Sequence, residues 1–269
     1  MTQSTSAIQL DRATKLFPAA GGGTFTAMRD VTLDVAPGEF VTVVGPTGCG
    51  KSTTLSLISG LEPASGGKVA VGGVPVTGIP DKVGYMFQQD ATLPWRTVTD
   101  NVALGLRYRG VPKAQARERA HEWIDRVGLR GFEKYYPHQL SGGMRKRVAM
   151  AQTLITEPEI LLLDEPFGAL DVQTRELMQA ELLRLWAGTG AAVVFVTHDL
   201  TEAIALADRV VVMTAAPATV KSVVHVTLPR PRNVDEIRLD PHFLDLYREV
   251  WQGLKEEVEI ARERGATRG

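Results

Sequence analysis

The sequence predicts an α/β fold in which an α-helical subdomain is inserted into a core built on a parallel β-sheet. Short β-branched runs, which are typical of buried strands, alternate along the chain with helical patterns. The run Phe40–Val44 leads into a glycine-rich turn and then into a helical pattern over Ser52–Ser59, which Gly60 would end. From Thr97 to Ile155 the pattern is mostly helical, and strand-like runs return afterwards.

The later strand-like runs are short and apolar. None approaches the roughly 20 consecutive apolar residues that a membrane-spanning helix needs. We therefore expect them to be buried strands, and we expect any role at a membrane to depend on a partner protein. They are Ile160–Leu163, Ala191–Val196 and Val210–Met213.

Two apolar faces at helical spacing support the helical middle of the chain. The first is followed by Gly128, which is well placed to end a helix. The two faces are formed by Ala120, Trp123, Ile124 and Val127, and by Met144, Val148, Ala151 and Ile155.

A long amphipathic helix is predicted near the C-terminus. Asp240 and Pro241 form a favourable N-cap and first-turn pair. A stripe of this kind usually packs on its own domain, although a partner or a membrane surface would favour the same pattern. The stripe consists of Phe243, Tyr247, Val250, Trp251, Leu254, Val258 and Ala261.

The composition excludes several classes of function. Among the 269 residues, 30 Lys and Arg nearly balance 31 Asp and Glu, so nucleic-acid binding is not expected. The single cysteine, Cys49, excludes an internal disulfide and a cysteine-built zinc site. The first ten residues lack the apolar run of a signal peptide. We therefore expect a cytosolic compartment.

The segment Gly45–Ser52 reads GPTGCGKS and lies between a predicted strand and a predicted helix, which is the context of a phosphate-binding loop. Its glycines allow backbone N–H groups to approach phosphate. Lys51 would bind the β- and γ-phosphates, and the Ser52 hydroxyl would bind Mg²⁺. The predicted nucleotide-binding residues here are Gly45, Pro46, Thr47, Gly48, Cys49, Gly50, Lys51, Ser52 and Thr53.

Two acidic residues follow the apolar run Ile160–Leu163. Asp164 would hold Mg²⁺, directly or through water, and Glu165 would accept a proton from the attacking water. An apolar strand that ends in two acids is common by itself. Downstream of a phosphate loop, it indicates a nucleotide-hydrolysing site.

A second phosphate site is predicted at the segment LSGGM, Leu140–Met144. Ser141 can cap the following helix, and Gly142 and Gly143 leave its N-terminal amides uncovered for an anion. One chain cannot easily present two separate phosphate sites to one nucleotide. Two chains that face each other head to tail can do so.

With these motifs in this order, the whole chain resembles the nucleotide-binding domains of the ABC transporter family. The resemblance implies ATP and Mg²⁺ as cofactors, ATP hydrolysis as the activity, and a homodimer that sandwiches each ATP between the phosphate loop of one copy and the LSGG segment of the other. By the same resemblance, Phe17 in ATKLF stacks on adenine, and Gln88 in VGYMFQQD senses Mg²⁺ and the γ-phosphate. Asp171 in GALD crosses to the other copy, and His198 in VVFVTH contacts the γ-phosphate.

The resemblance also implies a single domain over residues 1–269. Its P-loop NTPase core, which is RecA-like, would comprise residues 1–92 and 156–225. The helical subdomain would comprise residues 93–155, and a helical tail would comprise residues 226–269. The family places such a subunit at the cytoplasmic face of the membrane, bound to integral-membrane permease subunits and, through them, to an extracytoplasmic substrate-binding protein.

Three segments resemble one branch of this family, the bacterial importers of nitrate, sulfonates, taurine and thiamine-precursor pyrimidines. They are LPWRTVTDNV, DEPFGALDVQTR and LPRPRNVDEIR. In this family no side chain of the ATP-binding subunit contacts the cargo, so the cargo itself is not encoded here.

Two alternative classes remain at this point. Soluble ABC ATPases usually join two cassettes or carry a coiled-coil insert, and this chain shows neither pattern. A kinase or GTPase with a P-loop would not need the LSGGM segment or His198.

Two residues carry further expectations. Cys49 lies inside the phosphate loop, where a reactive thiol would make the site sensitive to thiol reagents. Trp95 lies in the stretch that leads from Gln88 to the helical subdomain, where the family docks a permease helix. The alternative is that Trp95 covers the core of that subdomain.

Overall fold

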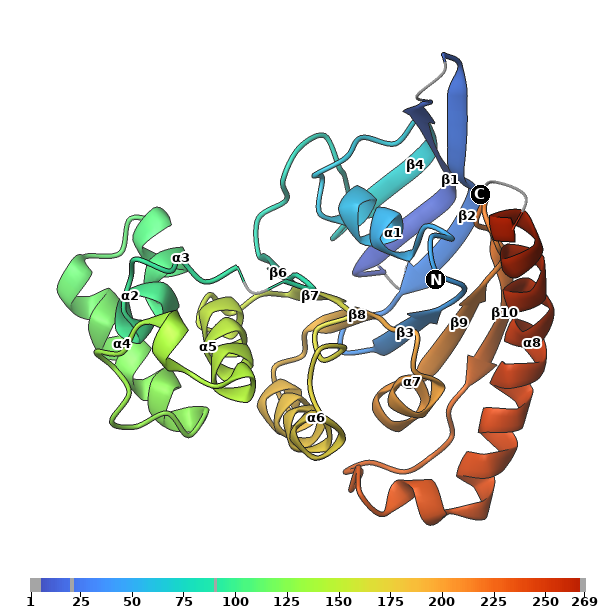
Figure 1. Ribbon diagram of the computed structural model, residues 1–269. Coiled ribbons are helices and arrows are strands. Elements are labelled where there is room, and N and C mark those ends of the chain that lie inside the picture. The colour runs from blue at the N-terminus through green and yellow to red at the C-terminus, as the bar shows by residue number, and fades with distance from the viewer. Residues whose placement is uncertain (1–5, 20–21, 90, 267–269) are drawn as a thin grey trace, which may run out of the picture.

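The protein contains two β-sheets and two groups of helices, shown in the computed structural model in Figure 1. The structure describes residues 6–19, 22–89 and 91–266, so half of the N-terminal stretch examined for a signal peptide lies outside it. The larger sheet is parallel except for its edge strand β10, which pairs antiparallel with β9. Its strands, in spatial order, are β10 (Val220–His225), β9 (Arg209–Met213), β3 (Phe40–Val44), β8 (Ala192–Val196), β7 (Ile160–Asp164) and β6 (Val83–Met86).

The strands expected around Phe40, Ile160, Ala191 and Val210 all belong to this sheet, which confirms the predicted α/β fold. A second, antiparallel sheet was not predicted. Its longest pair, β1 with β2, contains several register shifts, which interrupt the alternation by which strands are recognised. Its strands, in spatial order, are β2 (Thr24–Val35), β1 (Ile8–Pro18), β4 (Gly66–Val71) and β5 (Val74–Pro75).

The parallel sheet is covered on both faces, as its nearly continuous apolar strands require. Val41 and Val43 pack in a cluster with the antiparallel sheet and with helix α1 (Lys51–Ile58), which lies between the two sheets in Figure 1. Phe40 and Val44 belong to a second cluster on the opposite face, formed with the remaining helices. Helix α1 is thereby held with its first turn at the end of β3.

Four helices form a lobe beside the sheet (Figure 1). Both predicted apolar faces lie in its core, where every residue is buried except Met144, which is partly buried. Gly128 follows α4 with φ of 69°, as expected of a residue that ends a helix. The helices are α2 (Val98–Val102), α3 (Leu104–Tyr108), α4 (Lys113–Arg126) and α5 (Gly142–Leu154), and the short 3₁₀ helix η1 (Pro137–Gln139) precedes α5.

The C-terminal helix α8 (Pro241–Ala266) packs on its own domain, beside β9 and β10 (Figure 1). Phe243, Val250 and Leu254 of the predicted stripe are buried, whereas Tyr247 and Trp251 remain partly exposed at its flank. Within the described part of the chain, no helix combines the length and the apolar character that crossing a bilayer requires. Helices α6 (Val172–Trp186) and α7 (Leu200–Leu206) and the 3₁₀ helix η2 (Ile237–Leu239) complete the fold.

The segment LPRPRNVDEIR fastens the tail to the C-terminal end of α7. Arg232 is buried and donates hydrogen bonds to the carbonyl oxygens of Ala205 and Ala207, at 3.3 and 2.5 Å. Its burial lowers the pKa of the guanidinium to about 10. Arg230 binds Asp208 at 2.7 Å and lies over the ring of Trp186. Arg230 Nη2 also donates to the Leu206 carbonyl oxygen at 2.7 Å. The two arginines therefore satisfy carbonyl groups that the end of a helix leaves without partners.

Candidate functional site

The phosphate loop connects β3 to α1 and presents uncapped backbone amides. Gly48 and Gly50 have φ of 74° and 115°, a region that residues with a Cβ rarely adopt. Gly50 is the N-cap residue of α1, and no side chain caps this helix. The first N–H groups of α1 are therefore available, and the helix dipole favours an anion at this end.

Lys51 and Ser52 lie at the start of α1. The Lys51 side chain is buried, and its Nζ donates to the carbonyl oxygens of Gly45 and Pro46 at 2.9 and 3.1 Å. The Ser52 hydroxyl donates to Asp164 Oδ1 at 2.9 Å. A cationic donor and a hydroxyl–carboxylate pair are thus held side by side at the mouth of the loop.

Asp164 stands at the end of β7, where burial raises the pKa of its carboxyl group. Tyr85 on the adjacent strand β6 lies with its hydroxyl 3.4 Å from Asp164 Oδ2, and burial raises the pKa of this phenol. Sequence reasoning missed Tyr85. The sequence shows only a tyrosine in a short strand-like run, and the pairing of that strand with β7 is visible only in the structure.

Two predicted catalytic side chains meet at the carboxylate of a third. Glu165 Oε2 lies 3.1 Å from His198 Nδ1 and 3.5 Å from Gln88 Nε2. Glu165 adopts a φ of 41°, which is uncommon for a residue with a side chain and is often seen at functional sites. The ends of β6, β7 and β8 thus bring Gln88, Glu165 and His198 together, as expected where parallel strands end at the same edge.

These groups line one open cavity of about 500 Å³. Phe17, the predicted adenine-stacking residue, also lines it, together with Phe25, which sequence reasoning missed. The two phenylalanines are paired across β1 and β2, so the antiparallel sheet supplies two rings to the same wall. The lining residues are Phe17, Phe25, Ala27, Thr47, Gly48, Gly50, Lys51, Ser52, Thr53, Gln88, Glu165 and His198.

Ser141, Gly142, Gly143 and Asp171 do not line this cavity. Ser141 caps α5 by accepting a hydrogen bond from the Met144 N–H at 3.3 Å, as the sequence predicted. A Cβ on Gly143 would lie 2.8 Å from the side chain of Thr174, so glycine is needed for close packing there. Asp171 caps α6 by accepting from the Thr174 N–H at 3.0 Å.

Cys49 does not fit the expectation of a reactive thiol. Its side chain is 1% exposed and belongs to the cluster beneath the phosphate loop. Burial raises the pKa of the thiol, and only the thiolate is nucleophilic. The burial of Cys49 therefore argues against the expected sensitivity, because its Sγ lies in the core and its backbone is the part that can approach a phosphate.

We expect iodoacetamide at neutral pH to modify Cys49 in the folded protein at least roughly 10-fold more slowly than in the urea-unfolded chain. Mass spectrometry of samples quenched over time measures both rates. Because the chain has a single cysteine, the Cys49→Ser variant is the blank. Equal rates in the folded and unfolded protein would contradict the burial of the thiol.

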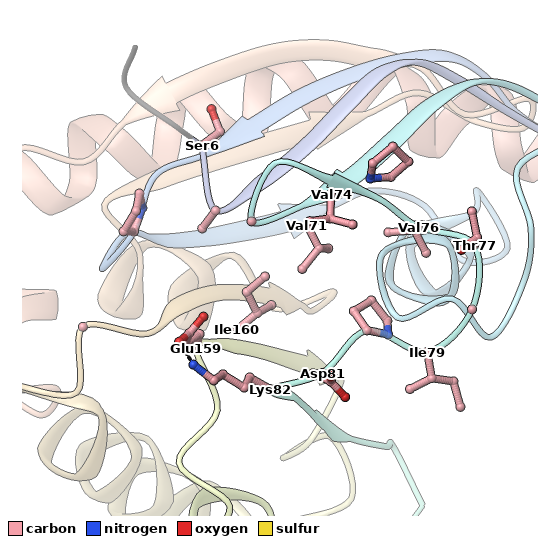
Figure 2. A pocket seen from close by; sticks show the side chains of 17 residues that line it. Ser6, Val71, Val74, Val76, Thr77, Ile79, Asp81, Lys82, Glu159 and Ile160 are labelled. Carbon is pink, nitrogen blue, oxygen red and sulfur yellow. Dashed lines mark hydrogen bonds and ion pairs between the residues drawn. The ribbon is translucent and has the colours of Figure 1, made fainter. Parts of the chain in front are cut away.

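A larger cavity, of about 780 Å³, lies away from these residues (Figure 2). Apolar side chains such as Val71, Ile79 and Ile160 form its walls. Of its charged residues, Lys82 and Glu159 form an ion pair with each other. It therefore lacks the converging donors and carboxylates found at the phosphate loop, and we place the functional site at the loop.

In the described part of the chain, no group of three or more His, Cys, Asp or Glu residues could hold a metal by itself. Mg²⁺ does not need such a group, because it keeps several waters and is usually bound through one or two carboxylates together with substrate phosphates.

Comparisons with known proteins agree with this geometry. A family model described as "ABC transporter" matches residues 28–168. An uncharacterized ABC transporter ATP-binding protein of Methanocaldococcus jannaschii is 46% identical over 251 residues, which are 93% of this chain and 92% of that protein. The taurine import ATP-binding protein TauB of Escherichia coli is 42% identical over 237 residues, which are 87% of this chain and 93% of that protein.

The fold is also shared with solved structures. The dimeric structure of a post-hydrolysis state of the ATP-binding cassette MJ0796, bound to ADP and Pi, has a TM-score of 0.73 and 31% sequence identity. The match covers 82% of this chain and 100% of the MJ0796 chain. The chain therefore belongs to the ABC transporter family, as an ATP-binding protein with ATPase activity.

Proposed function

We propose that this chain is the ATP-hydrolysing subunit of an import system, and that two copies face each other head to tail with ATP between them. The separation of Ser141 and Asp171 from the cavity of Lys51 carries this proposal, because one chain cannot bring all of these groups to one nucleotide. The dimeric structure of the ATP-binding cassette MJ0796 with ADP and Pi supports the assembly of two copies.

Within each composite site, Phe17 stacks on adenine and the loop from Gly45 to Thr53 binds the phosphates. Lys51 binds the β- and γ-phosphates as a charged donor. Ser141, Gly142 and Gly143 of the facing copy bind the γ-phosphate from the other side, and the Asp171 loop crosses at the same contact. The uncapped amides of α1 and the position of Phe17 in the cavity wall support these roles.

Ser52 and Asp164 would hold Mg²⁺, with Gln88 as an additional ligand. The adjacent hydroxyl and carboxylate are oxygen donors of the kind that Mg²⁺ prefers, and their 2.9 Å contact indicates that both can face one ion. When bound there, Mg²⁺ would neutralise charge on the phosphate oxygens.

Glu165 acts as the general base that accepts a proton from the attacking water. His198 lies 3.1 Å from its carboxylate and would contact the γ-phosphate, while Gln88 reports the state of the site to the helical lobe. The positions of these groups at neighbouring strand ends support a single reacting centre. Together with Lys51, they are the proposed catalytic residues.

The cassette works as a peripheral subunit at the cytoplasmic face of the membrane, bound to permease subunits and indirectly to an extracytoplasmic binding protein. A groove of about 400 Å³ supports a contact with the permease alone. Phe87, Tyr108 and Gln152 are among its lining residues, so it lies between the segment of Gln88 and the helical lobe. A permease helix would dock there. We propose that residues 93–155 move as a subdomain against the core of residues 1–92 and 156–225, with residues 226–269 as a tail.

The proposed cargo class is nitrate, a sulfonate such as taurine, a similar small anion, or a thiamine precursor. The three branch-like sequence segments and the name of the taurine import relative support this class. Stimulation of the reconstituted complex by each candidate solute, together with its binding protein, would identify the cargo.

The two halves of the composite site can be separated by mutation. Lys51→Ala should raise the Kd for ATP roughly 10- to 100-fold, because a charge-assisted contact contributes about 1.5–3 kcal/mol. Ser141→Arg should leave ATP binding by the monomer intact and block dimer formation. Nucleotide titration and size-exclusion chromatography measure the two effects.

Gln115→Arg, at an exposed position of the same lobe, is the matched control for adding an arginine. It should dimerise and hydrolyse ATP normally. A mixture of the Lys51→Ala and Ser141→Arg variants can rebuild at most one intact composite site in each dimer. Normal dimerisation and hydrolysis by Ser141→Arg alone would exclude the head-to-tail arrangement.

A further inference from the structure

Two contacts join α6 to the segment that carries His198. Near the surface, Arg175 Nη1 lies 3.3 Å from Asp199 Oδ2, and Arg175 Nη2 donates to the Leu170 carbonyl at 3.0 Å. One turn further along each helix, Gln179 Nε2 donates to Glu202 Oε1 at 3.0 Å. We call these two contacts the α6–α7 ladder.

The inner contact of the ladder is buried and reaches the residue before His198. Glu202 is only 4% exposed, and Gln179 is fully buried. Glu202 Oε2 accepts a hydrogen bond from the Thr197 hydroxyl, whose oxygen in turn accepts from the Asp199 N–H at 3.0 Å. The backbone on both sides of His198 is thus tied to one buried carboxyl group.

The N-cap residue of the same helix α6 is Asp171, in the loop that would cross to the second copy. Arg175 donates a hydrogen bond to the carbonyl oxygen of Leu170, the residue before Asp171, and also contacts Asp199. Arg175 therefore links the Asp171 loop to Asp199. A shift of α6 would therefore be passed to the segment of His198 through both contacts. Nothing in the hydrolytic chemistry itself requires a buried acid at Glu202, which touches neither the cavity nor Glu165.

We propose that Glu202 is a positioning residue, which holds His198 against Glu165 and, through Gln179, ties its placement to the α6 loop that meets the second copy. This rests on the proposed function of His198 in ATP hydrolysis. The ladder would make hydrolysis respond to the facing copy, because the γ-phosphate contact and the contact between copies share one rigid connection.

Burial favours the neutral form of Glu202 and raises its pKa to about 7, more strongly than the hydrogen bonds from Thr197 and Gln179 lower it. Of the facing charges, Asp199 raises this pKa and Arg175 lowers it. Because the folded state then binds a proton more tightly than the unfolded state, this group makes the protein less stable as pH rises from about 4.5 to about 7. Glutamine has nearly the same shape and no charge. Its single amide oxygen can accept from the Thr197 hydroxyl, and its NH2 group can donate to the Gln179 amide oxygen once the Gln179 amide is turned over, so glutamine can keep both contacts of Glu202.

The test is a double-mutant cycle with His198→Ala, measured on ATP hydrolysis by the full chain. Glu202→Ala should lower kcat roughly 10-fold, with the Kd for ATP changed less than about 3-fold, because a buried hydroxyl and amide lose their partner near His198 and not near Lys51. Glu202→Gln should restore kcat to within about 3-fold of the wild type. In the His198→Ala background, Glu202→Ala should cause no further loss.

Ile8→Ala, a cavity-forming change in the antiparallel sheet, is the control for general destabilisation and should leave kcat unchanged. Thr197→Val keeps the side-chain shape and removes the hydroxyl, so it tests the same contact if Glu202→Ala does not fold. As a second readout, the gain in Tm of Glu202→Gln over the wild type should be larger at pH 8 than at pH 5.

Each outcome separates this proposal from the function on which it rests. If the kcat losses of Glu202→Ala and His198→Ala multiply in the double variant, Glu202 acts independently of His198. That result would overturn the positioning role of Glu202 and leave the role of His198 intact. A normal kcat in His198→Ala would overturn the assigned role of His198 and this proposal together. If Glu202→Gln has a kcat as low as that of Glu202→Ala, then lost shape and lost hydrogen bonds do not cause the lower kcat of Glu202→Ala.

Discussion

Replacing Glu165 by glutamine should remove nearly all ATP hydrolysis while ATP still binds. A well-placed general base typically contributes about 10²- to 10⁴-fold to the rate, and glutamine cannot accept the proton of the attacking water. The substitution preserves the size of the side chain beside His198 and Gln88. Binding should persist because the phosphate loop, Lys51 and Ser52 are unchanged.

The Glu165→Gln protein should also accumulate as an ATP-bound dimer, since separation of the copies would wait for hydrolysis. Phosphate release and size-exclusion chromatography with ATP measure the two effects. Glu118→Gln, an exposed position on α4, is the matched control and should hydrolyse ATP at the normal rate. Near-normal turnover by purified Glu165→Gln would exclude this residue as the base.

The phosphate loop could be predicted from sequence because its chemistry is contiguous. All of its groups fall within Gly45–Thr53, between a continuous buried strand and the helix that follows the glycine-rich turn. The helix begins at Lys51, one residue earlier than the pattern indicated. A short segment with strict backbone requirements leaves few alternatives, so local pattern and final structure agree here.

The meeting of Gln88, Glu165 and His198 could not be derived from spacing. Glu165 is 77 residues from Gln88 and 33 from His198, and only the order of strands β6, β7 and β8 brings them together. Glu165 was predicted from its place after an apolar strand, and family resemblance supplied Gln88 and His198, whereas the sheet supplies the geometry of all three. Phe25 was missed for a related reason, because its relevance depends on pairing with Phe17 across two irregular strands.

Buried polar contacts were the least predictable part. The sequence analysis did not single out Glu202, which lies in the first turn of α7, where acids are usually found near the surface. Its burial depends on how α6 packs beside α7, which no local pattern encodes. The burial of the Cys49 thiol was unpredictable for the same reason. The sequence places Cys49 in the phosphate loop but does not show in which direction its side chain points.

Trp95 lies in a loop that is clamped from within. The buried Asn101 side chain accepts from the Leu93 N–H at 2.7 Å and donates to the carbonyls of Leu93 and Arg96 at 3.1 and 3.0 Å. Trp95 is nevertheless 71% exposed as a whole residue. This excludes the alternative that Trp95 covers the core of the helical lobe. A rigid loop that presents an exposed tryptophan is a good anchor for a partner.

Trp95→Ala should therefore leave basal hydrolysis by the isolated subunit nearly unchanged and weaken its assembly with the permease. Loss of an aromatic anchor costs about 2 kcal/mol or more, roughly 30-fold in affinity. In the assembled complex, stimulation of ATP hydrolysis by the loaded binding protein should fall sharply. Coupling of binding between two sites is reciprocal, so the contact that transmits ATP closure outward should also transmit the effect of cargo inward.

The decisive measurement compares basal with cargo-stimulated ATP hydrolysis in reconstituted membranes. Leu239→Ala, which removes another highly exposed apolar side chain just before α8, is the control and should keep full stimulation. Asn101→Ala should release the loop without altering the ring, and should reduce stimulation in the same direction; its Tm shows whether the lobe remains folded. If Trp95→Ala lowers basal and stimulated rates by the same factor, the loop from Leu93 to Thr97 does not transmit the motion to the permease.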